Sequence, residues 1–170
     1  DALCRKNKGE WVKTSSLEYI KNSYLVATWL YSMGIRKGDK VATILSNSPQ
    51  WNMIDMGAAL IGAVHVPIYT TLNLGEVEYI LDHSDAQILF INDKSVYRKY
   101  SSVFINNIAI KKTVTINDDV DNTYFWNELL KEAETLSSKY KENIEDIKAS
   151  IQPDDLLSII YTSGTTGTPK

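Results

Sequence analysis

Three short apolar segments between residues 40 and 91 decide the fold: Lys40-Val-Ala-Thr-Ile-Leu45, Val64-His-Val-Pro-Ile-Tyr69 and Gln87-Ile-Leu-Phe-Ile91. Their length and their content of Val and Ile are typical of buried strands. Helical patterns separate them, at residues 47–61 and 76–83. Strands and short helices that alternate at near-even spacing favour right-handed βαβ units. We therefore predict an α/β fold, a parallel sheet with flanking helices.

Capping and breaking residues mark the helices around these strands. Ser15 and Glu18 have capping-box spacing, and Gly34 is a stop signal for the helix that Ser15 begins. Ser48 is expected to cap the next helix, with Pro49 at the first helical position. Apolar residues recur at helical intervals in both segments: Leu17, Ile20, Tyr24, Ala27 and Tyr31 in the first, and Trp51, Ile54, Ala58 and Ile61 on the inner face of the second, which Gly62 ends.

The remaining parts of the chain are less regular. Pro67 cannot donate to a strand ladder, so we expect it at a sheet edge, a bulge or a strand end. The other expected elements are an edge strand at 10–13, a strand at 112–116, an acidic loop at 118–122, a helix at 126–140, a connector at 144–150, a turn at 153–155 and a last buried strand at 156–160.

Composition restricts the function classes. The chain has 170 residues, a net charge of −3 and 44% apolar residues, which is typical of a soluble globular protein. The absence of a basic excess argues against nucleic acid as a partner. Cys4 is the only cysteine, so no disulfide can form within the chain, and a reducing, cytoplasmic compartment is expected. The longest largely apolar stretch, 56–69, is too short to span a bilayer.

A loop rich in hydroxyls and glycine follows the last expected strand: Tyr161-Thr-Ser-Gly-Thr-Thr-Gly-Thr-Pro-Lys170. Gly164 and Gly167 allow the backbone to turn its N–H groups toward an anion. The hydroxyl side chains can donate further hydrogen bonds, and Lys170 supplies a positive charge. The lysine stands three residues after the second glycine, behind Pro169, so this is not a Walker loop. We predict that the loop binds phosphate.

Three other interpretations of this loop stay open from the residues alone. Such composition also occurs in Ser/Thr/Gly tails and linkers. A non-catalytic phosphate- or flavin-binding α/β module would use similar residues, although flavodoxin-like proteins place that loop after the first strand of the domain. A regulatory or interaction fragment with an idle loop is the third alternative.

The histidines are not expected to carry out catalysis. His65 lies within an apolar strand segment, where a packed histidine with satisfied hydrogen bonds is the better hypothesis than a general base. His83 falls at a helix C-terminus, where positive charge suits the helix dipole. We assign no chemistry to it.

The acidic clusters are not expected to bind metal. Asp118, Asp119 and Asp121 lack the glycine and the closing glutamate of a calcium loop, so a solvated loop is the better hypothesis. Asp154 and Asp155 are expected to cap or turn the chain before residue 156. Within the sequence we therefore assign no metal ligand and no catalytic residue.

The loop at Tyr161–Lys170 resembles the signature loop of the adenylate-forming (AMP-binding) enzymes, [ST]-S-G-[ST]-T-G-x-P-K, and violates none of its positions. Residues 60–69 resemble a second motif of that family, with G-A-x-x-V-P, and residues 35–42 resemble its G-[IV]-x-x-G-D-x-V-A stretch. Residues 69–71 and 78–84 are most similar to long-chain fatty acyl-CoA synthetases. The resemblance covers about residues 11–91 and 153–170.

The resemblance implies a two-step acid–thiol ligase of lipid metabolism. A fatty acid carboxylate attacks the α-phosphate of Mg-ATP to give acyl-AMP and pyrophosphate, and the coenzyme A thiol then displaces AMP. It implies that the ATP β- and γ-phosphates are bound by Thr162, Ser163, Gly164, Thr165, Thr166, Gly167 and Lys170. Cytoplasmic placement with peripheral membrane contact would suit a long-chain substrate. The acyl chain length and the oligomeric state, a homodimer included, stay open.

The resemblance also implies how the domains are organised. Residues 1–170 are expected to be an incomplete N-terminal portion of the large AMP-binding domain, ending at the phosphate-binding loop, with the small C-terminal domain absent. The adenine, ribose and metal-binding groups and the lysine of the C-terminal domain are expected downstream. The fragment alone is therefore expected to be inactive and to bind nucleotide weakly at best.

Overall fold

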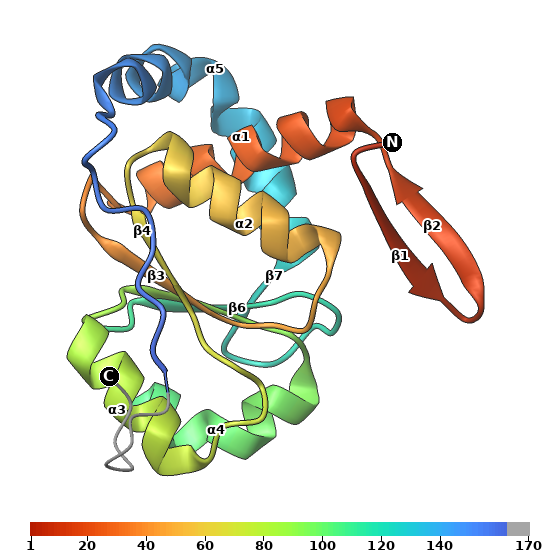
Figure 1. Cartoon of the computed structure of the whole chain (residues 1–170), viewed down its shortest axis with the longest axis vertical. Helices are drawn as coiled ribbons and strands as arrows, with labels where there is room; N and C mark the ends of the chain where they lie inside the picture. The colour runs from red at the N-terminus through yellow and green to blue at the C-terminus, as the bar shows by residue number, and fades with distance from the viewer. Residues whose placement is uncertain (163–170) are drawn as a thin grey trace.

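A five-stranded parallel sheet forms the centre of the structure (Figure 1). The computed structural model describes residues 1–162. The strands follow the order β4-β3-β5-β6-β7, and every neighbouring pair is parallel. Their bounds are Lys40–Ile44 for β3, Val64–Pro67 for β4, Ile88–Ile91 for β5, Lys112–Thr115 for β6 and Tyr124–Phe125 for β7. The predicted parallel α/β sheet is confirmed.

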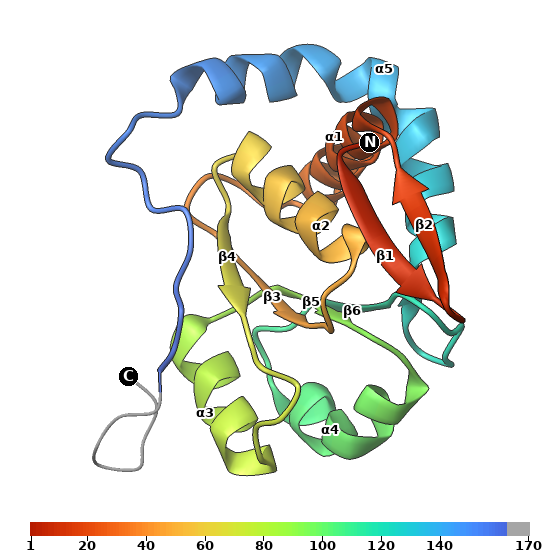
Figure 2. The same ribbon diagram turned by 45° about the vertical axis from the view of Figure 1, so that its right-hand side comes forward.

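Helices cover both faces of this sheet (Figures 1 and 2). One face packs against α1 (Ser16–Ser32), α2 (Pro49–Leu60) and α5 (Trp126–Ser150), and the other against α3 (Leu74–Ser84) and α4 (Lys94–Asn106). Strand residues alternate between the two cores: Phe90 joins the α1 side, whereas Leu89 and Ile91 join the α3 side. Burial on both faces explains why β5 is apolar at every position.

The predicted boundaries of α1 and α2 are confirmed. The Ser15 side chain accepts a hydrogen bond from the Glu18 N–H at 3.1 Å, and Ser48 caps α2 from one residue before Pro49. Gly34 and Gly62, which follow α1 and α2, have φ of 86° and 66°. Only glycine adopts this left-handed conformation without strain, so both helices end where these residues stand.

Some expected details of the helices are wrong. Leu17 and Ile20 are exposed, because the buried stripe of α1 is offset by one residue from the expected apolar stripe. The buried residues include Val26, Trp29 and Leu30. The connector predicted at 144–150 is the last part of α5, where the buried Ile144 packs on the core. Helix α4, capped by Asp93, was missed in a stretch that the sequence shows as irregular.

An antiparallel hairpin precedes α1 and projects from the body of the protein (Figure 1). It joins β1 (Leu3–Asn7) to β2 (Glu10–Thr14) through a turn in which Lys8 and Gly9 both have positive φ. The strand predicted at 10–13 is confirmed as β2. Its partner β1 was not predicted, because its charged sequence lacks the apolar alternation of a strand.

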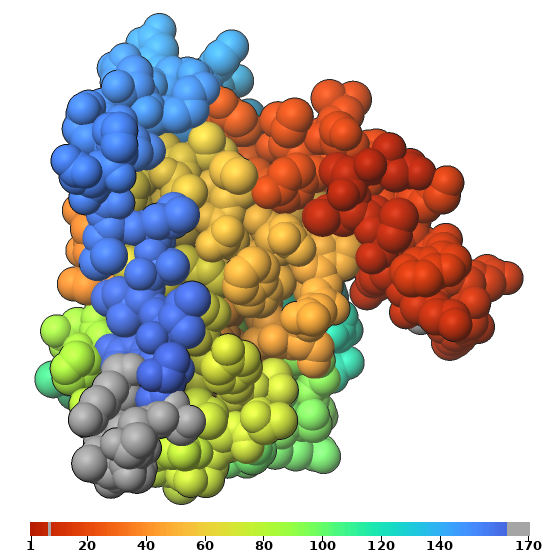
Figure 3. All heavy atoms as spheres, in the orientation of Figure 1, coloured from red at the N-terminus to blue at the C-terminus, as the bar shows by residue number. Residues whose placement is uncertain are grey.

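The predicted buried strand at 156–160 is wrong. This segment runs parallel to the edge strand β4 but forms only one isolated bridge, between His65 and Ser158. Figure 3 shows it on the surface of the protein, in blue. Leu156, Leu157 and Ile160 are 56–58% exposed, because no second strand within residues 1–162 covers their outer side. Apolar content alone does not distinguish such an edge from a buried strand.

We expect Gly57→Ala to destabilise the fold. A Cβ atom on Gly57 of α2 would lie 2.6 Å from Val26 Cγ1 and 3.0 Å from the Ser23 carbonyl oxygen of α1. Val26 is fully buried and cannot move aside, so overpacking should cost about 1–3 kcal/mol in the free energy of unfolding. Urea unfolding of the wild-type protein and of Gly57→Ala would measure this loss.

The matched control is Gly75→Ala in α3, where the nearest atom would lie 3.6 Å from the new Cβ. This change should leave stability unchanged or raise it slightly, because alanine favours helix. Equal effects at the two glycines would contradict the close α1–α2 packing.

Candidate functional site

A cavity of about 560 Å³ lies at the carboxyl ends of β3 and β4. Its walls come from the loop after β3, from α2, from the residues after β4 and from the segment 157–160. Trp51 and Tyr69 give it an aromatic lining, and Asn47 and Asp55 give it polar groups. Open α/β sheets bind ligands outside the carboxyl ends of their strands. This cavity, together with the chain that leads into the predicted phosphate loop, is our candidate site.

His65 links three elements beneath this cavity. Its side chain is 1% exposed. Nδ1 lies 2.8 Å from Asp55 Oδ1 on α2, and Nε2 lies 2.8 Å from Thr43 Oγ1 on β3. Because a carboxylate only accepts, Nδ1 carries the proton, and Nε2 accepts from the Thr43 hydroxyl. Both ring nitrogens are satisfied, so the predicted packed histidine is confirmed.

The segment 157–161 is positioned from two sides. The Leu157 carbonyl accepts from the His65 N–H at 3.0 Å, and the Ile159 N–H donates to the His65 carbonyl at 2.9 Å. Tyr161 is 7% exposed. Its hydroxyl oxygen lies 2.7 Å from His83 Nδ1 on α3. Burial, then the nearby Tyr79 and Asp85, raise the pKa of Tyr161. The chain therefore reaches residue 162 from a fixed position.

The sequence did not reveal the partnership of His83. Tyr161 stands 78 residues further along the chain, and no local pattern joins the two. The sequence shows only that each residue can form a hydrogen bond: a histidine at a helix end and a tyrosine before the loop. Their meeting depends on how α3 and the last segment pack.

Most of the predicted phosphate-binding residues lie outside the described part of the chain. Thr162 is the last described residue, and its side chain is exposed. Outside the described residues lie Ser163, Gly164, Thr165, Thr166, Gly167 and Lys170. Their role stays a prediction.

The acidic residues hold turns and helix ends. Asp155 accepts from the Gln152 N–H at 2.7 Å and pairs with Lys37, and these contacts lower its pKa. The turn predicted before residue 156 is confirmed. Asp118 accepts from the Lys94 N–H at 3.0 Å. Within residues 1–162, no group of three His, Cys, Asp or Glu side chains could hold a metal ion.

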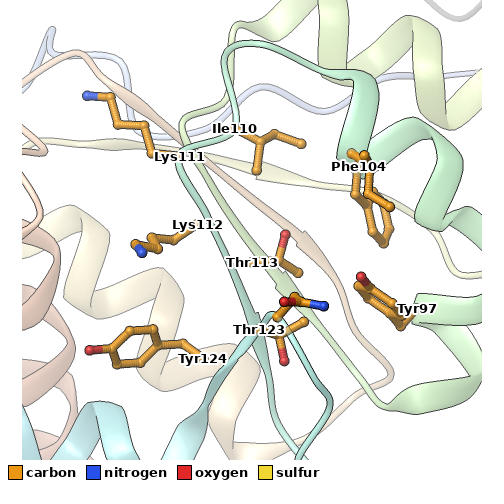
Figure 4. A pocket seen from close by; sticks show the side chains of 10 residues that line it. Tyr97, Phe104, Ile110, Lys111, Lys112, Thr113, Thr123 and Tyr124 are labelled. Carbon is orange, nitrogen blue, oxygen red and sulfur yellow. The ribbon is translucent and has the colours of Figure 1, made fainter.

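A second pocket, of about 440 Å³, lies at the opposite edge of the sheet (Figure 4). Tyr97 and Phe104 of α4 lie on one side of it, facing Thr113 and Thr123. In the sheet, β5 lies between β3, which borders the candidate site, and β6, which borders this pocket. It is therefore a distinct surface feature.

The sheet and the placement of its cavity define a ligand-binding α/β protein of the doubly wound kind. The chain belongs to the family of AMP-binding enzymes, which matches residues 2–170. The long-chain-fatty-acid–CoA ligase ACSBG2 of Gallus gallus is 30% identical over 175 residues, which cover 99% of this chain and 22% of that protein. Fatty acyl-CoA synthetase A of Dictyostelium discoideum is 30% identical over 85% of this chain and 22% of its own length.

Solved structures agree with this assignment. The Mycobacterium tuberculosis fatty acyl CoA synthetase superposes with a TM-score of 0.70 at 27% identity, covering 94% of this chain and 28% of that chain. The anthranilate CoA ligase AuaEII, solved with anthranoyl-AMP, has a TM-score of 0.72 at 24% identity and supports the fold alone. The chain thus spans less than a third of these proteins. No helix of residues 1–162 has the length and apolar character needed to cross a membrane.

We expect Thr43→Val to destabilise the protein. Valine keeps the shape and the strand preference of threonine but leaves the buried His65 Nε2 without its donor. An unsatisfied buried acceptor should cost about 1–3 kcal/mol. Thermal and urea unfolding would measure the loss.

The matched control is Thr113→Val in β6, where the hydroxyl borders the open second pocket. It should be neutral or slightly stabilising. A stable Thr43→Val protein would show that His65 finds another partner there.

Proposed function

We propose that this chain is part of an ATP-dependent long-chain fatty acid–CoA ligase. The parent enzyme would activate a carboxylate as acyl-AMP, with release of pyrophosphate, and would transfer the acyl group to the coenzyme A thiol. The observation that carries the proposal is the unbroken signature loop at 161–170 within a chain that matches the AMP-binding family over residues 2–170. The fatty acid–CoA ligase relatives support the substrate class.

The proposed role of the loop is electrostatic. In-line displacement at the α-phosphate requires that the triphosphate be held and its charge neutralised. Backbone N–H groups and hydroxyls of residues 162–167 would bind the β- and γ-phosphates, and Lys170 would add positive charge. Magnesium would enter with ATP, held by its phosphates and by side chains downstream of residue 170.

The domain organisation is part of the same proposal. Residues 1–170 would form the first portion of the large AMP-binding domain. The adenine, ribose and metal-binding groups and the lysine of the small C-terminal domain would lie in the remaining chain. Cytoplasmic placement, with peripheral membrane contact, would suit a long-chain substrate. Membership of the AMP-binding family favours this function over a flavin-binding module.

Replacing Lys170 with alanine in the complete parent enzyme tests the role of the loop. Pyrophosphate release would be recorded with Mg-ATP, coenzyme A and a panel of fatty acids. We expect release that depends on the carboxylate, and a fall in kcat of about 100-fold in Lys170→Ala, because the positive charge beside the departing pyrophosphate is lost. Lys170→Arg, which keeps the charge, should retain more activity.

Absence of release with every carboxylate would contradict the proposed reaction. Absorbance near 450 nm in the purified protein would instead support the flavin-binding alternative. Undiminished pyrophosphate release by Lys170→Ala would show that the lysine has no role in the site, although the proposed reaction would still hold.

The 170-residue chain by itself should be inactive. Under the proposed domain organisation the groups that adenylation needs would lie downstream, so palmitate-dependent pyrophosphate release should stay at background. The same assay with the complete enzyme is the positive control. Turnover by the short chain would show that the essential groups lie within these residues.

A further inference from the structure

We propose that His83 positions the phosphate loop through Tyr161, the residue that immediately precedes it. The inference rests on the proposed function, because it assumes that the loop binds the phosphates of ATP. Neither side chain is assigned contact with substrate. His83 is therefore a positioning residue rather than a catalytic one.

The argument begins with the way the chain approaches the loop. Backbone hydrogen bonds to His65 fix residues 157 and 159 beside β4. Ile160 is 57% exposed and contributes little restraint. The bond between the Tyr161 hydroxyl and His83 Nδ1, 2.7 Å long, is the last tether along the described part of the chain. Thr162 follows directly, so this tether sets where the loop begins.

The phenol of Tyr161 is held by packing as well. It belongs to the core beneath α3 and α4, and its ring meets the His83 ring edge-on at 5.7 Å. Tyr79 stacks on His83 at 5.5 Å and meets Tyr161 edge-on at 6.5 Å. Three rings therefore fix one another, and Tyr161 cannot shift without breaking both kinds of contact.

His83 is suited to be a fixed reference point. It stands in the last turn of α3, whose first turn is closed by a reciprocal capping box between Asn73 and Glu76. Val77 and Leu81 bury the inner side of the helix. His83 is exposed to solvent, but its Nδ1 contacts the hydroxyl of the buried Tyr161. The hydrogen bond between His83 Nδ1 and the Tyr161 hydroxyl therefore joins this helix to the chain just before the loop.

The consequence is specific to ATP. A loop that binds phosphate by backbone and hydroxyl groups needs its first residue in place, and a small displacement weakens several hydrogen bonds together. The fatty acid and coenzyme A do not use these bonds under the proposed function. Loss of the tether should therefore raise the KM and the Kd for ATP and leave the KM for the fatty acid unchanged.

The test uses the complete parent enzyme, four single variants and the double variant Tyr161→Phe/His83→Leu. Tyr161→Phe removes only the hydroxyl, whereas His83→Leu removes the hydrogen-bond partner together with the ring contacts to Tyr79 and Tyr161. His83→Asn keeps a polar atom on Cγ near the place of Nδ1. The control is Tyr124→Phe, which removes a tyrosine hydroxyl that donates to Glu132 at 2.9 Å on the other side of the sheet.

We expect Tyr161→Phe and His83→Leu each to raise the KM and the calorimetric Kd for ATP about two- to tenfold, the range for one lost hydrogen bond. The double variant should be no worse than His83→Leu alone, since the bond that Tyr161→Phe removes is already absent there. His83→Asn should restore most of the affinity. Tyr124→Phe should leave both constants unchanged.

Two results would overturn the inference. One is unchanged ATP affinity in Tyr161→Phe and His83→Leu. The other is a fall in kcat and melting temperature at unchanged KM for ATP, which would show that the bond serves only the fold. Failure of the proposed function looks different: the wild-type enzyme would bind ATP without releasing pyrophosphate, and the Kd values would still decide the inference. A wild-type enzyme that binds no ATP would overturn both.

Discussion

Burial of both faces of β3 and β5 is the constraint on which the rest of the structure depends. Neither strand has a solvated face, so helices must cover both sides of the sheet, and parallel strands need crossovers long enough to supply them. Parallel strands also bring their carboxyl ends to one edge. The cavity beside Trp51 lies at that edge, and the segment that leads to the loop runs alongside β4, parallel to it.

Signals that act between neighbouring residues predicted several helices and strands correctly. Apolar runs located β3, β4, β5 and β6, and cap chemistry located the starts of α1 and α2, because Ser15, Ser48 and Pro49 act on their own neighbours. Prediction failed where packing decides. The exposure of Leu17 and of the segment 156–160 depends on which parts of the fold pack against them. Strand β1 forms by pairing with β2 and has no strand pattern of its own.

In the candidate site, too, some features could be predicted from the sequence and others could not. Chemistry that is written in one continuous stretch, such as the glycines and hydroxyls before Lys170, could be proposed from the sequence. Contacts between distant segments could not. His65 was correctly expected to be packed, but its partners on α2 and β3 were not, and His83 gave no sign of reaching Tyr161. Long-range hydrogen bonds leave no periodic trace in the sequence.

The segment beside β4 has a consequence for handling the protein. Its outer side presents unpaired backbone groups together with the exposed Leu157 and Ile160, within residues 1–162. An open, apolar strand edge is a template for pairing with another chain. A polypeptide that ended near here would tend to associate with itself as its concentration rises. The solubility of a truncated protein would thus depend on where its boundary falls relative to the sheet, more than on its net charge of −3.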